Sequence, residues 1–413
     1  MQDHEIHTFP NGIRLVYKQV FSTKITHCGY VLDIGSRDEN PHQLGLAHFW
    51  EHMVFKGTKK RKAFHILNRL DSVGGELNAY TTKEKICFYA SVLDSHLDKA
   101  IDLLTDITFD SIFPENQIER EKNVILEEMA MYLDNPEDSI QDDLDDLVFS
   151  NHSLGNNILG TKESISGFGR IDFRRFLKQN LNTSKIVFSV VTSLPLSKVI
   201  KICERFILDI PEFKGLNQRK SFSGYLPQTR ISRRSILQSH CGIGRTAYDL
   251  KHGKKLPFIL LTNMLGGPGM NSKLNLAVRE KFGFVYSIDA NFSSFTDTGL
   301  FSIFFATDQK HLSRCVGLVL KEMDKFRSKK LSEIQIHKAK EQFIGQIALA
   351  EENNTSLMLA MGKSLLDLEK IDTFQEILQK IRNITSEEVH QTASEMFDEN
   401  QLSFIYYKPT ATE

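Results

Sequence analysis

Residues 48–58 read HFWEHMVFKGT, in which His48 and His52 are four positions apart and Glu51 directly precedes the second histidine. On an α-helix, side chains at i and i+4 lie one above the other, so both imidazoles can bind one zinc ion. Glu51 lies beside His48 at i+3, where its carboxylate can accept a proton from zinc-bound water without being a ligand. The stretch therefore predicts a helix with a catalytic zinc site, in the inverted order of the H-E-x-x-H motif.

A site of this kind needs a third protein ligand and keeps one position open for water. Residues 116–135, NQIEREKNVILEEMAMYLDN, have helical spacing and offer Glu119, Glu121, Glu127 and Glu128. Glu121 and Glu128 are seven residues apart and share one helix face, so one can ligate while the other orients a histidine from behind. Spacing does not choose between Glu127 and Glu128, and a solvated acidic face is the alternative.

The composition is that of a globular protein with two or three domains: 413 residues, 41% hydrophobic, with 51 Lys plus Arg against 52 Asp plus Glu. A net charge of -1 argues against nucleic-acid binding. The five cysteines form no C-x-x-C pair, which fits neither a disulfide framework nor a thiolate zinc site. The first residues lack the pattern of a targeting peptide, and no apolar stretch reaches the ~20 residues of a membrane helix. We therefore expect a cytoplasmic protein that does not span a membrane.

Short matches between the two halves recur at a nearly constant offset of 213 to 216 residues, which predicts a duplicated domain. The matching pairs are His27-Cys28-Gly29 with His240-Cys241-Gly242, Phe88-x-Ala90 with Phe304-x-Ala306, and His96-Leu97 with His311-Leu312.

The coarse pattern of elements supports two similar halves. It predicts strands over 16–32 and 85–93 and helices over 45–55, 65–73, 96–108 and 116–133, then strands near 234–243, 286–293 and 300–307 and a helix over 312–326. Because strands and helices do not alternate strictly, the predicted class is α+β, with helices packed on a mostly antiparallel sheet in each domain. We expect a zinc-binding catalytic domain over 1–209, a linker over 210–224 and a homologous domain without the metal motif over 225–413.

At these residues the chain resembles the pitrilysin and mitochondrial-processing-peptidase (insulinase-like) family of inverzincin zinc metallopeptidases, of the half-length, two-domain type. The similarity covers HFWEHMVFKGT, GSRDE (35–39), GGELNAYT (74–81) and VILEEM (124–129). The resemblance assigns the third ligand to Glu128, 76 residues after His52, and matches Glu121 to the family's second acidic residue. One departure is Trp50, where an aliphatic residue is common, and we expect it to pack into the core.

The resemblance continues through LGGPGMNSKL (265–274) and VREK-x-G-x-x-Y (278–286). It implies that Arg279 and Tyr286 contact bound peptide near the zinc, where both can donate hydrogen bonds to a carbonyl that becomes an oxyanion. It also implies that Asn78, Ala79 and Tyr80 form an edge strand to which substrate adds by main-chain pairing, with a simple turn as the alternative. Half-length members pair with a second chain to close a chamber, so we expect a homodimer, with a heterodimer as the alternative.

Three further features have ordinary explanations. The loop GGPGMNSK (266–273) does not fit the phosphate-binding pattern G-x-x-x-x-G-K-[ST], which argues against a nucleotide site. The basic run 56–62 is interpreted as a solvated turn after the motif helix rather than a nucleic-acid patch. The acidic run 134–146 is interpreted as a solvated helix start, with a surface that attracts basic peptides as the alternative.

The sequence therefore predicts a zinc-dependent endopeptidase that hydrolyses peptides or small unfolded proteins inside a chamber. One Zn²⁺ per chain is expected on His48, His52 and Glu128, with Glu51 activating water, Glu121 behind the ligands and no other cofactor. The alternatives are a non-catalytic peptide-binding subunit, or a catalytic subunit that is active only with a different partner chain. Degenerate family members typically lose a ligand or the glutamate, and here all four positions are filled, which favours the enzyme.

Overall fold

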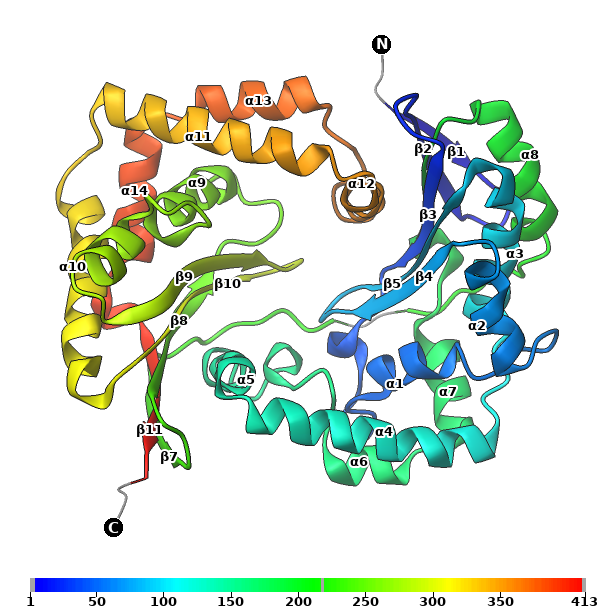
Figure 1. Cartoon of the computed structure of the whole chain (residues 1–413), viewed down its shortest axis with the longest axis horizontal. Coiled ribbons are helices and arrows are strands. Elements are labelled where there is room, and N and C mark those ends of the chain that lie inside the picture. Colours follow the sequence, from blue (N-terminus) through cyan, green and yellow to red (C-terminus); the bar gives the residue numbers. More distant parts are fainter. Residues whose placement is uncertain (1–3, 217–218, 411–413) are drawn as a thin grey trace. The chain divides into compact units, whose positions relative to one another are not determined.

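The computed structural model describes residues 4–216 and 219–410, which form two compact units. The first unit comprises Met1–Met129, Asn156–Arg219 and Leu349–Thr373, and the second comprises Ala130–Gly155, Lys220–Ala348 and Phe374–Glu413. Each unit contains one sheet with helices packed on it (Figure 1), so the predicted α+β class is confirmed. The domain ranges 1–209 and 225–413 stay a prediction, because each compact unit is assembled from three separate segments.

The sheet of the first unit has six strands in the order β1-β2-β6-β3-β5-β4, in which only β2 and β6 are parallel neighbours. The strands are β1 (Glu5–Thr8), β2 (Arg14–Gln19), β3 (Ile25–Leu32), β4 (Glu76–Thr81), β5 (Ile86–Leu93) and β6 (Ile186–Thr192). The single strand predicted over 16–32 is wrong, because β2 and β3 pair with opposite sides of β6 and the chain must turn between them.

Both faces of this sheet are buried, and the residues alternate between them with the period of two that a strand dictates. In β3, Tyr30 belongs to the main core, which includes helices α1 (Leu46–Met53), α3 (Leu97–Phe109), α7 (Arg170–Asn180) and α8 (Leu196–Ile207). Its neighbour Val31 belongs to a second hydrophobic cluster on the other face. Trp50 is fully buried with its ring 5.5 Å from that of Phe88, so its predicted place in the core is confirmed.

The sheet of the second unit repeats this arrangement in the order β7-β11-β8-β10-β9, with β7 and β11 parallel and the other neighbours antiparallel. The strands are β7 (Thr229–Arg234), β8 (Ser239–Ala247), β9 (Val285–Ser294), β10 (Gly299–Thr307) and β11 (Ser403–Pro409). The helices α9 (Lys255–Gly266), α10 (Leu312–Ser328) and α14 (Ser386–Met396) pack on one face. Because order and directions match β2-β6-β3-β5-β4, the predicted duplication is confirmed.

Each sheet is covered on its second face by a helix from the other half of the chain (Figure 1). Helix α12 (Asn354–Leu368) packs on β3 and β6, and helix α5 (Pro136–Val148) packs on β8 and β11. Both follow a long helix, α4 (Glu115–Asp134) and α11 (Glu333–Glu351) respectively, and both start at an asparagine N-cap. The two halves therefore exchange equivalent helices.

Packing of α5 also changes the interpretation of the acidic run 134–146. Asp143 accepts hydrogen bonds from Arg234 and from the Tyr407 hydroxyl, at 3.0 and 2.5 Å, and Asp146 pairs with Arg230 at 2.8 Å. The apolar face of the same helix is buried in the second unit. The acidic residues at the start of α5, Glu137 and Asp138, are exposed or half-exposed, as predicted for a solvated helix start, while Asp143 and Asp146 farther along the helix pair with arginines.

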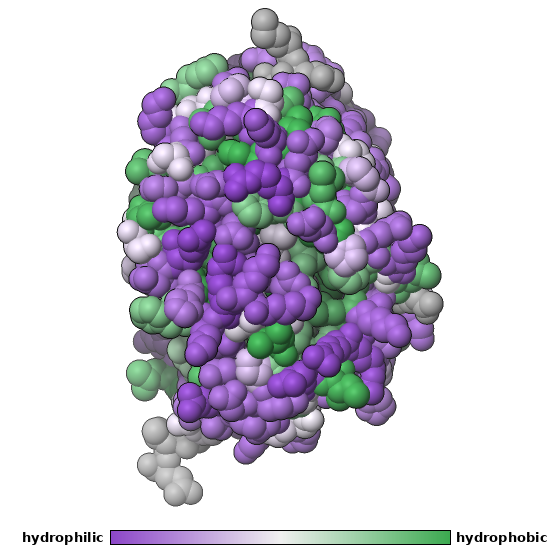
Figure 2. Space-filling model, turned by 90° about the vertical axis from the view of Figure 1, so that its right-hand side faces the viewer, coloured by the Kyte–Doolittle hydropathy of each residue, from purple (hydrophilic) through white to green (hydrophobic). Residues whose placement is uncertain are grey.

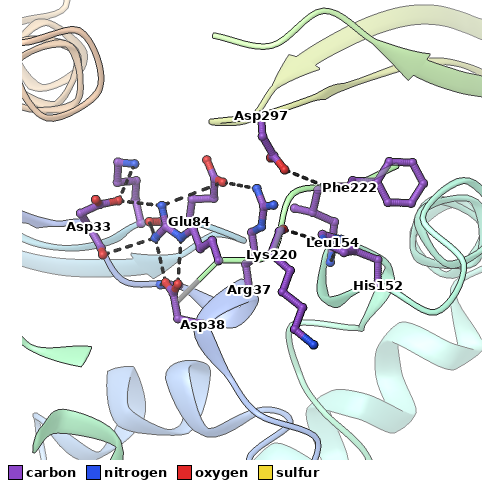
Figure 3. A network of polar contacts seen from close by, with 12 residues as sticks. Asp33, Arg37, Asp38, Glu84, His152, Leu154, Lys220, Phe222 and Asp297 are labelled. Carbon is purple, nitrogen blue, oxygen red and sulfur yellow. Dashed lines mark hydrogen bonds and ion pairs between the residues drawn. The ribbon is translucent and has the colours of Figure 1, made fainter. Parts of the chain in front are cut away.

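A buried charge network holds Arg219 to the first unit (Figure 3). Its guanidinium donates two hydrogen bonds of 2.8 Å to Asp38 and one of 2.9 Å to Asp33. Figure 3 shows Asp33 and Asp38 within this network of polar contacts. Lys85 extends the network from Asp33, at 3.1 Å, to Asp367 on α12, at 2.7 Å. Paired charges of this kind are costly to break once buried, so the network fastens both Arg219 and α12 to the first sheet.

The remaining α-helices are α2 (Ala63–Asp71), α6 (Lys162–Gly167) and α13 (Phe374–Asn383). All five cysteines are buried and free. Figure 2 shows one face of the molecule, on which hydrophilic residues predominate and hydrophobic residues form small separate patches. Among the described residues, no helix has the length and apolar character required to cross a bilayer.

We predict that Gly362→Ala destabilises the first unit, because a Cβ at this position of α12 would lie 2.7 Å from Cγ2 of Val31. Overpacking of this kind costs about 1–3 kcal/mol, against a gain of up to about 1 kcal/mol from the higher helix propensity of alanine. The control is Gly167→Ala at the end of α6, where a Cβ would meet no atom within 4 Å. The urea concentration at the midpoint of unfolding should be lower for Gly362→Ala than for the control. Equal midpoints would contradict close packing of α12 on β3.

Candidate metal centre

Helix α1 carries the HFWEH motif, and its start is held by a buried carboxylate. Glu39 accepts hydrogen bonds from the backbone N–H groups of Gly45 and Ala47, at 2.9 and 2.7 Å. Burial raises the pKa of Glu39 to about 8, although both hydrogen bonds oppose the rise. Gly45 has a φ of 89°, and a Cβ there would lie 2.5 Å from the carbonyl oxygen of Leu159. Only glycine suits this position, so the backbone around it sets where α1 begins.

Three side chains with metal-binding atoms meet between α1 and α4. Nε2 of His48 lies 3.7 Å from Oε1 of Glu128, and Nε2 of His52 lies 3.4 Å from Oε2 of the same carboxylate. One donor atom from each of the three residues lies within 4.8 Å of the others. Ligand atoms at the corners of a tetrahedral zinc site are about 3.4 Å apart, so the donor set and its spacing fit such an ion. Glu127 is exposed, and the structure brings Glu128 to the histidines instead.

The predicted carboxylate behind the ligands, Glu121, is buried on the same face of α4. Its Oε1 lies 3.0 Å from Nδ1 of His52, which leaves Nε2 of that ring directed to Glu128. Its Oε2 lies 2.7 Å from Nζ of Lys56, three residues after the end of α1. A carboxylate on the outer nitrogen of a metal-binding histidine typically orients the ring. The sequence interpretation placed Lys56 in a solvated turn and missed this contact, which helical spacing does not indicate because α1 ends at Met53.

Other members of the basic run 56–62 also have acidic partners. Lys59 pairs with Asp110 at 2.7 Å, and Arg61 pairs with Asp102 and with Asp106, the latter at 2.5 Å. The interpretation as a solvated turn is therefore wrong for Lys56 and Arg61, whose charges are compensated by partly or fully buried carboxylates. Such compensation also argues against a nucleic-acid patch.

The two histidines differ in their electrostatic surroundings. Burial lowers the pKa of His48 to about 4, with repulsion from His52 adding to the effect. Burial alone would also lower the pKa of His52, but hydrogen bonds with Glu121 and Glu128 outweigh it and raise the pKa to about 9. Nδ1 of His48 is buried and finds no hydrogen-bond partner among the described residues. Metal binding requires both rings in the neutral form, so a cation entering this site would displace a proton from His52.

Glu51 lies one turn from His48 and is held by a contact with strand β4. The Thr81 hydroxyl donates a hydrogen bond of 2.5 Å to Oε2 of Glu51. Burial raises the pKa of Glu51 above its usual value, while the bond from Thr81 acts in the opposite direction. A partly buried carboxylate with a raised pKa is typical of a group that exchanges protons. The sequence interpretation gave Thr81 no role, although it ends the stretch GGELNAYT.

Asn78, Ala79 and Tyr80 lie in β4, which is the last strand of the first sheet. These residues pair with β5 through Tyr89, Phe88 and Cys87, and no strand among the described residues pairs with the other side of β4. The structure therefore places the three residues at a sheet edge, where unpaired N–H and C=O groups can accept a further strand.

Arg279 and Tyr286 come together within the second unit. Arg279 lies in η5 (Asn275–Glu280), a π-helical turn in which the N–H of Lys281 donates to the carbonyl of Leu276. Tyr286 lies in β9 and is 90% exposed, with its ring centroid 5.9 Å from the Arg279 guanidinium carbon. Both line a cavity of about 200 Å³ beside the glycine-rich loop. Single π-helical turns are rare and occur frequently at functional sites.

Two family models match consecutive parts of the chain. The model for insulinase (peptidase family M16) matches residues 14–162, and the model for the peptidase M16 inactive domain matches residues 168–343. Among curated relatives, the "Uncharacterized zinc protease YmxG" of Bacillus subtilis is 32% identical over 95% of this chain and 96% of its own length. An "Uncharacterized zinc protease" of Streptomyces coelicolor is 31% identical over 94% of this chain and 86% of its own length.

Two solved structures share the fold. A peptidase M16 inactive domain from Pseudomonas fluorescens has a TM-score of 0.91 at 16% identity and covers 100% of this chain and 99% of its own. A protease from Helicobacter pylori has a TM-score of 0.89 at 18% identity and covers 98% of this chain and 99% of its own. At these identities the likeness shows the fold, while the relatives and family models show the ancestry: the chain belongs to the insulinase family, peptidase family M16.

Proposed function

We propose that this chain is a zinc endopeptidase that cleaves peptides or small unfolded proteins. The observation that carries the proposal is the convergence of His48, His52 and Glu128 within 4.8 Å, with Glu51 one residue before the second histidine. Relatives over the whole chain bear the name zinc protease, which supports zinc as the cofactor. We expect one zinc ion per chain, because only this group of histidine and carboxylate side chains has the required spacing among the described residues.

A zinc ion held by these three side chains would act as a Lewis acid toward water and toward the substrate carbonyl. Glu51 then serves as the proton carrier: it accepts a proton from the attacking water and delivers it to the leaving amine. The bond from Thr81 occupies one oxygen, Oε2, and so directs the carboxylate while leaving Oε1 for the proton. The raised pKa of Glu51 suits this exchange better than that of an ordinary surface glutamate.

Glu121 and Lys56 form the support for His52. Glu121 holds Nδ1 of the ring, and Lys56 neutralises the carboxylate, so the ring keeps one orientation without adding net negative charge near Glu128. Outer partners of this kind typically change metal affinity or activity by 10–100-fold when removed.

Substrate binding is assigned to the edge strand β4 and to Arg279 with Tyr286. A peptide that pairs with Asn78, Ala79 and Tyr80 would be held by main-chain hydrogen bonds, which tolerate many sequences. The exposed Tyr286 hydroxyl and the Arg279 guanidinium can both donate hydrogen bonds to a peptide carbonyl. Enclosure in a chamber, formed with an identical or a different partner chain, belongs to this proposal as well.

A second candidate function is a peptide-binding subunit that does not cleave, or one that needs a different partner chain for activity. Residues 168–343 match the family's inactive domain, which favours a binding role for that part of the chain. The complete set of donors in residues 48–128 favours the enzyme over this alternative.

The first test compares the wild-type protein with Glu51→Gln on a mixed peptide library, with and without a chelator. Loss of the proton carrier should lower kcat/KM by about 10²–10⁴-fold while the zinc content is unchanged, and the chelator should abolish wild-type cleavage. Cleavage products are measured by mass spectrometry. Glu127→Gln is the control, because this neighbouring glutamate is exposed and should leave the rate within about twofold.

The outcomes separate the two candidates. If the wild-type protein retains zinc, cuts nothing and matches Glu51→Gln, the lone chain is not an endopeptidase. Cleavage that appears only after a second chain is added would support the partner-dependent alternative.

The second test concerns Thr81. Thr81→Val keeps the shape and β-propensity of the residue but removes the donor to Glu51, so kcat should fall about tenfold with little change in KM. Thr81→Ser retains the hydroxyl and should restore most of the rate. Steady-state kinetics on one cleaved peptide provides the comparison, and equal kcat values for Thr81→Val and the wild-type protein would remove Thr81 from the mechanism.

A further inference from the structure

A second concave site lies wholly within the second unit and has no part in the proposed peptidase chemistry. It is a cavity of about 600 Å³ between one face of α10, the η5 turn with its flanking residues, and the start of α11. This volume lies within the range of 300–1,000 Å³ that is typical of pockets for small organic molecules. We call it the lysine pocket, after the residues that dominate its lining.

Six lysines line the lysine pocket and only one acidic residue, Glu322, does so. The six are Lys273, Lys281, Lys321, Lys325, Lys329 and Lys330.

Two of these charges are compensated within the protein. Lys325 pairs with Glu322 at 2.6 Å, and Lys330 pairs with Glu387 at 2.7 Å. The other four, Lys273, Lys281, Lys321 and Lys329, form no ion pair with any residue in the ranges 4–216 and 219–410, and the ammonium of Lys281 lies 5.4 Å from the ring centroid of Phe282. Like charges that share one concavity repel one another, and an anionic ligand would relieve this repulsion.

The lysines surround an apolar surface. Leu318, Lys321, Lys325 and Lys329 follow one another at i, i+3, i+7 and i+11, which places them along one face of α10 and its C-terminal end. Leu276 and Phe282 line the opposite wall, and Leu276 is 44% exposed although it is a large hydrophobic side chain. A fully hydrated anion would use the lysines but leave this apolar surface in contact with water.

We propose that the lysine pocket binds a small amphipathic phosphate monoester, in which a phosphate group is attached to an alkyl or aromatic body. The phosphate carries a charge of about -1.5 to -2 at pH 7 and has three acceptor oxygens, which matches a group of uncompensated lysines better than a single carboxylate does. Lysine binds phosphate as a point charge, so it does not require the planar geometry of arginine. The apolar body covers Leu276, Leu318 and Phe282.

The probe for this site is octyl phosphate, titrated into the purified full-length protein by isothermal calorimetry. We expect saturable binding of one molecule per chain, and at least tenfold weaker binding of inorganic phosphate, octanol and octyltrimethylammonium. Lys321→Gln and Lys329→Gln should each lower the affinity for octyl phosphate about tenfold, because each removes a charge-assisted contact. The control is Lys338→Gln on α11, an exposed lysine outside the pocket, which should bind as the wild-type protein does.

Leu318→Ser tests the apolar contribution to binding separately from the charge. It should weaken the binding of octyl phosphate and leave the binding of inorganic phosphate unchanged. Circular dichroism establishes that each variant is folded. The proposal is overturned by an absence of saturable binding, by equal affinity of Lys321→Gln and the wild-type protein, or by inorganic phosphate binding as tightly as octyl phosphate. Binding to vesicles of phosphatidic acid without binding of monomeric octyl phosphate would also overturn it, in favour of a membrane surface. None of these results depends on peptidase activity.

Discussion

The contact between α1 and α4 is the constraint on which the rest of the site depends. A single helix can present two imidazoles one turn apart, but it cannot also supply a third donor at the spacing of a tetrahedral ion. Glu128 closes that set from α4, at 3.7 Å from His48 and 3.4 Å from His52, and Glu121 on the same face secures His52 from behind. Glu39 and Gly45 hold the start of α1, and β4 holds Glu51 through Thr81.

The fold protects this contact by burying both faces of the first sheet. The main core packs Trp50 and its neighbours on α1 against the sheet, and α12 covers the opposite face. Because α12 comes from residues 354–368, the first sheet depends on a segment far away in the sequence. In the second unit, α5 from the first half of the chain covers the equivalent face of the second sheet. Asp367 and Arg219 add charge pairs that hold these distant segments in place.

The sequence predicted what local spacing determines and missed what long-range packing determines. The i and i+4 histidines and the seven-residue interval between Glu121 and Glu128 were sufficient to predict one metal-binding face on each helix. Choosing Glu128 over Glu127 needed the family resemblance, since both glutamates have helical spacing. The hydrophobic face of α5 shows that the helix packs on something but not on which sheet, so the exchange with α12 was not predictable. The match of Phe88-x-Ala90 with Phe304-x-Ala306 is one residue out of register, because Cys28 faces Ala90 whereas Cys241 faces Phe305.

The most direct test of the account is the zinc content of the purified chain after exhaustive dialysis against metal-free buffer. Elemental analysis should find one zinc ion per chain in the wild-type protein and in Glu127→Gln, whose side chain is exposed. Glu128→Gln should lose most of the metal, because it removes the carboxylate that completes the set with His48 and His52. Full zinc occupancy in Glu128→Gln, with loss in Glu127→Gln, would contradict the assignment of the site.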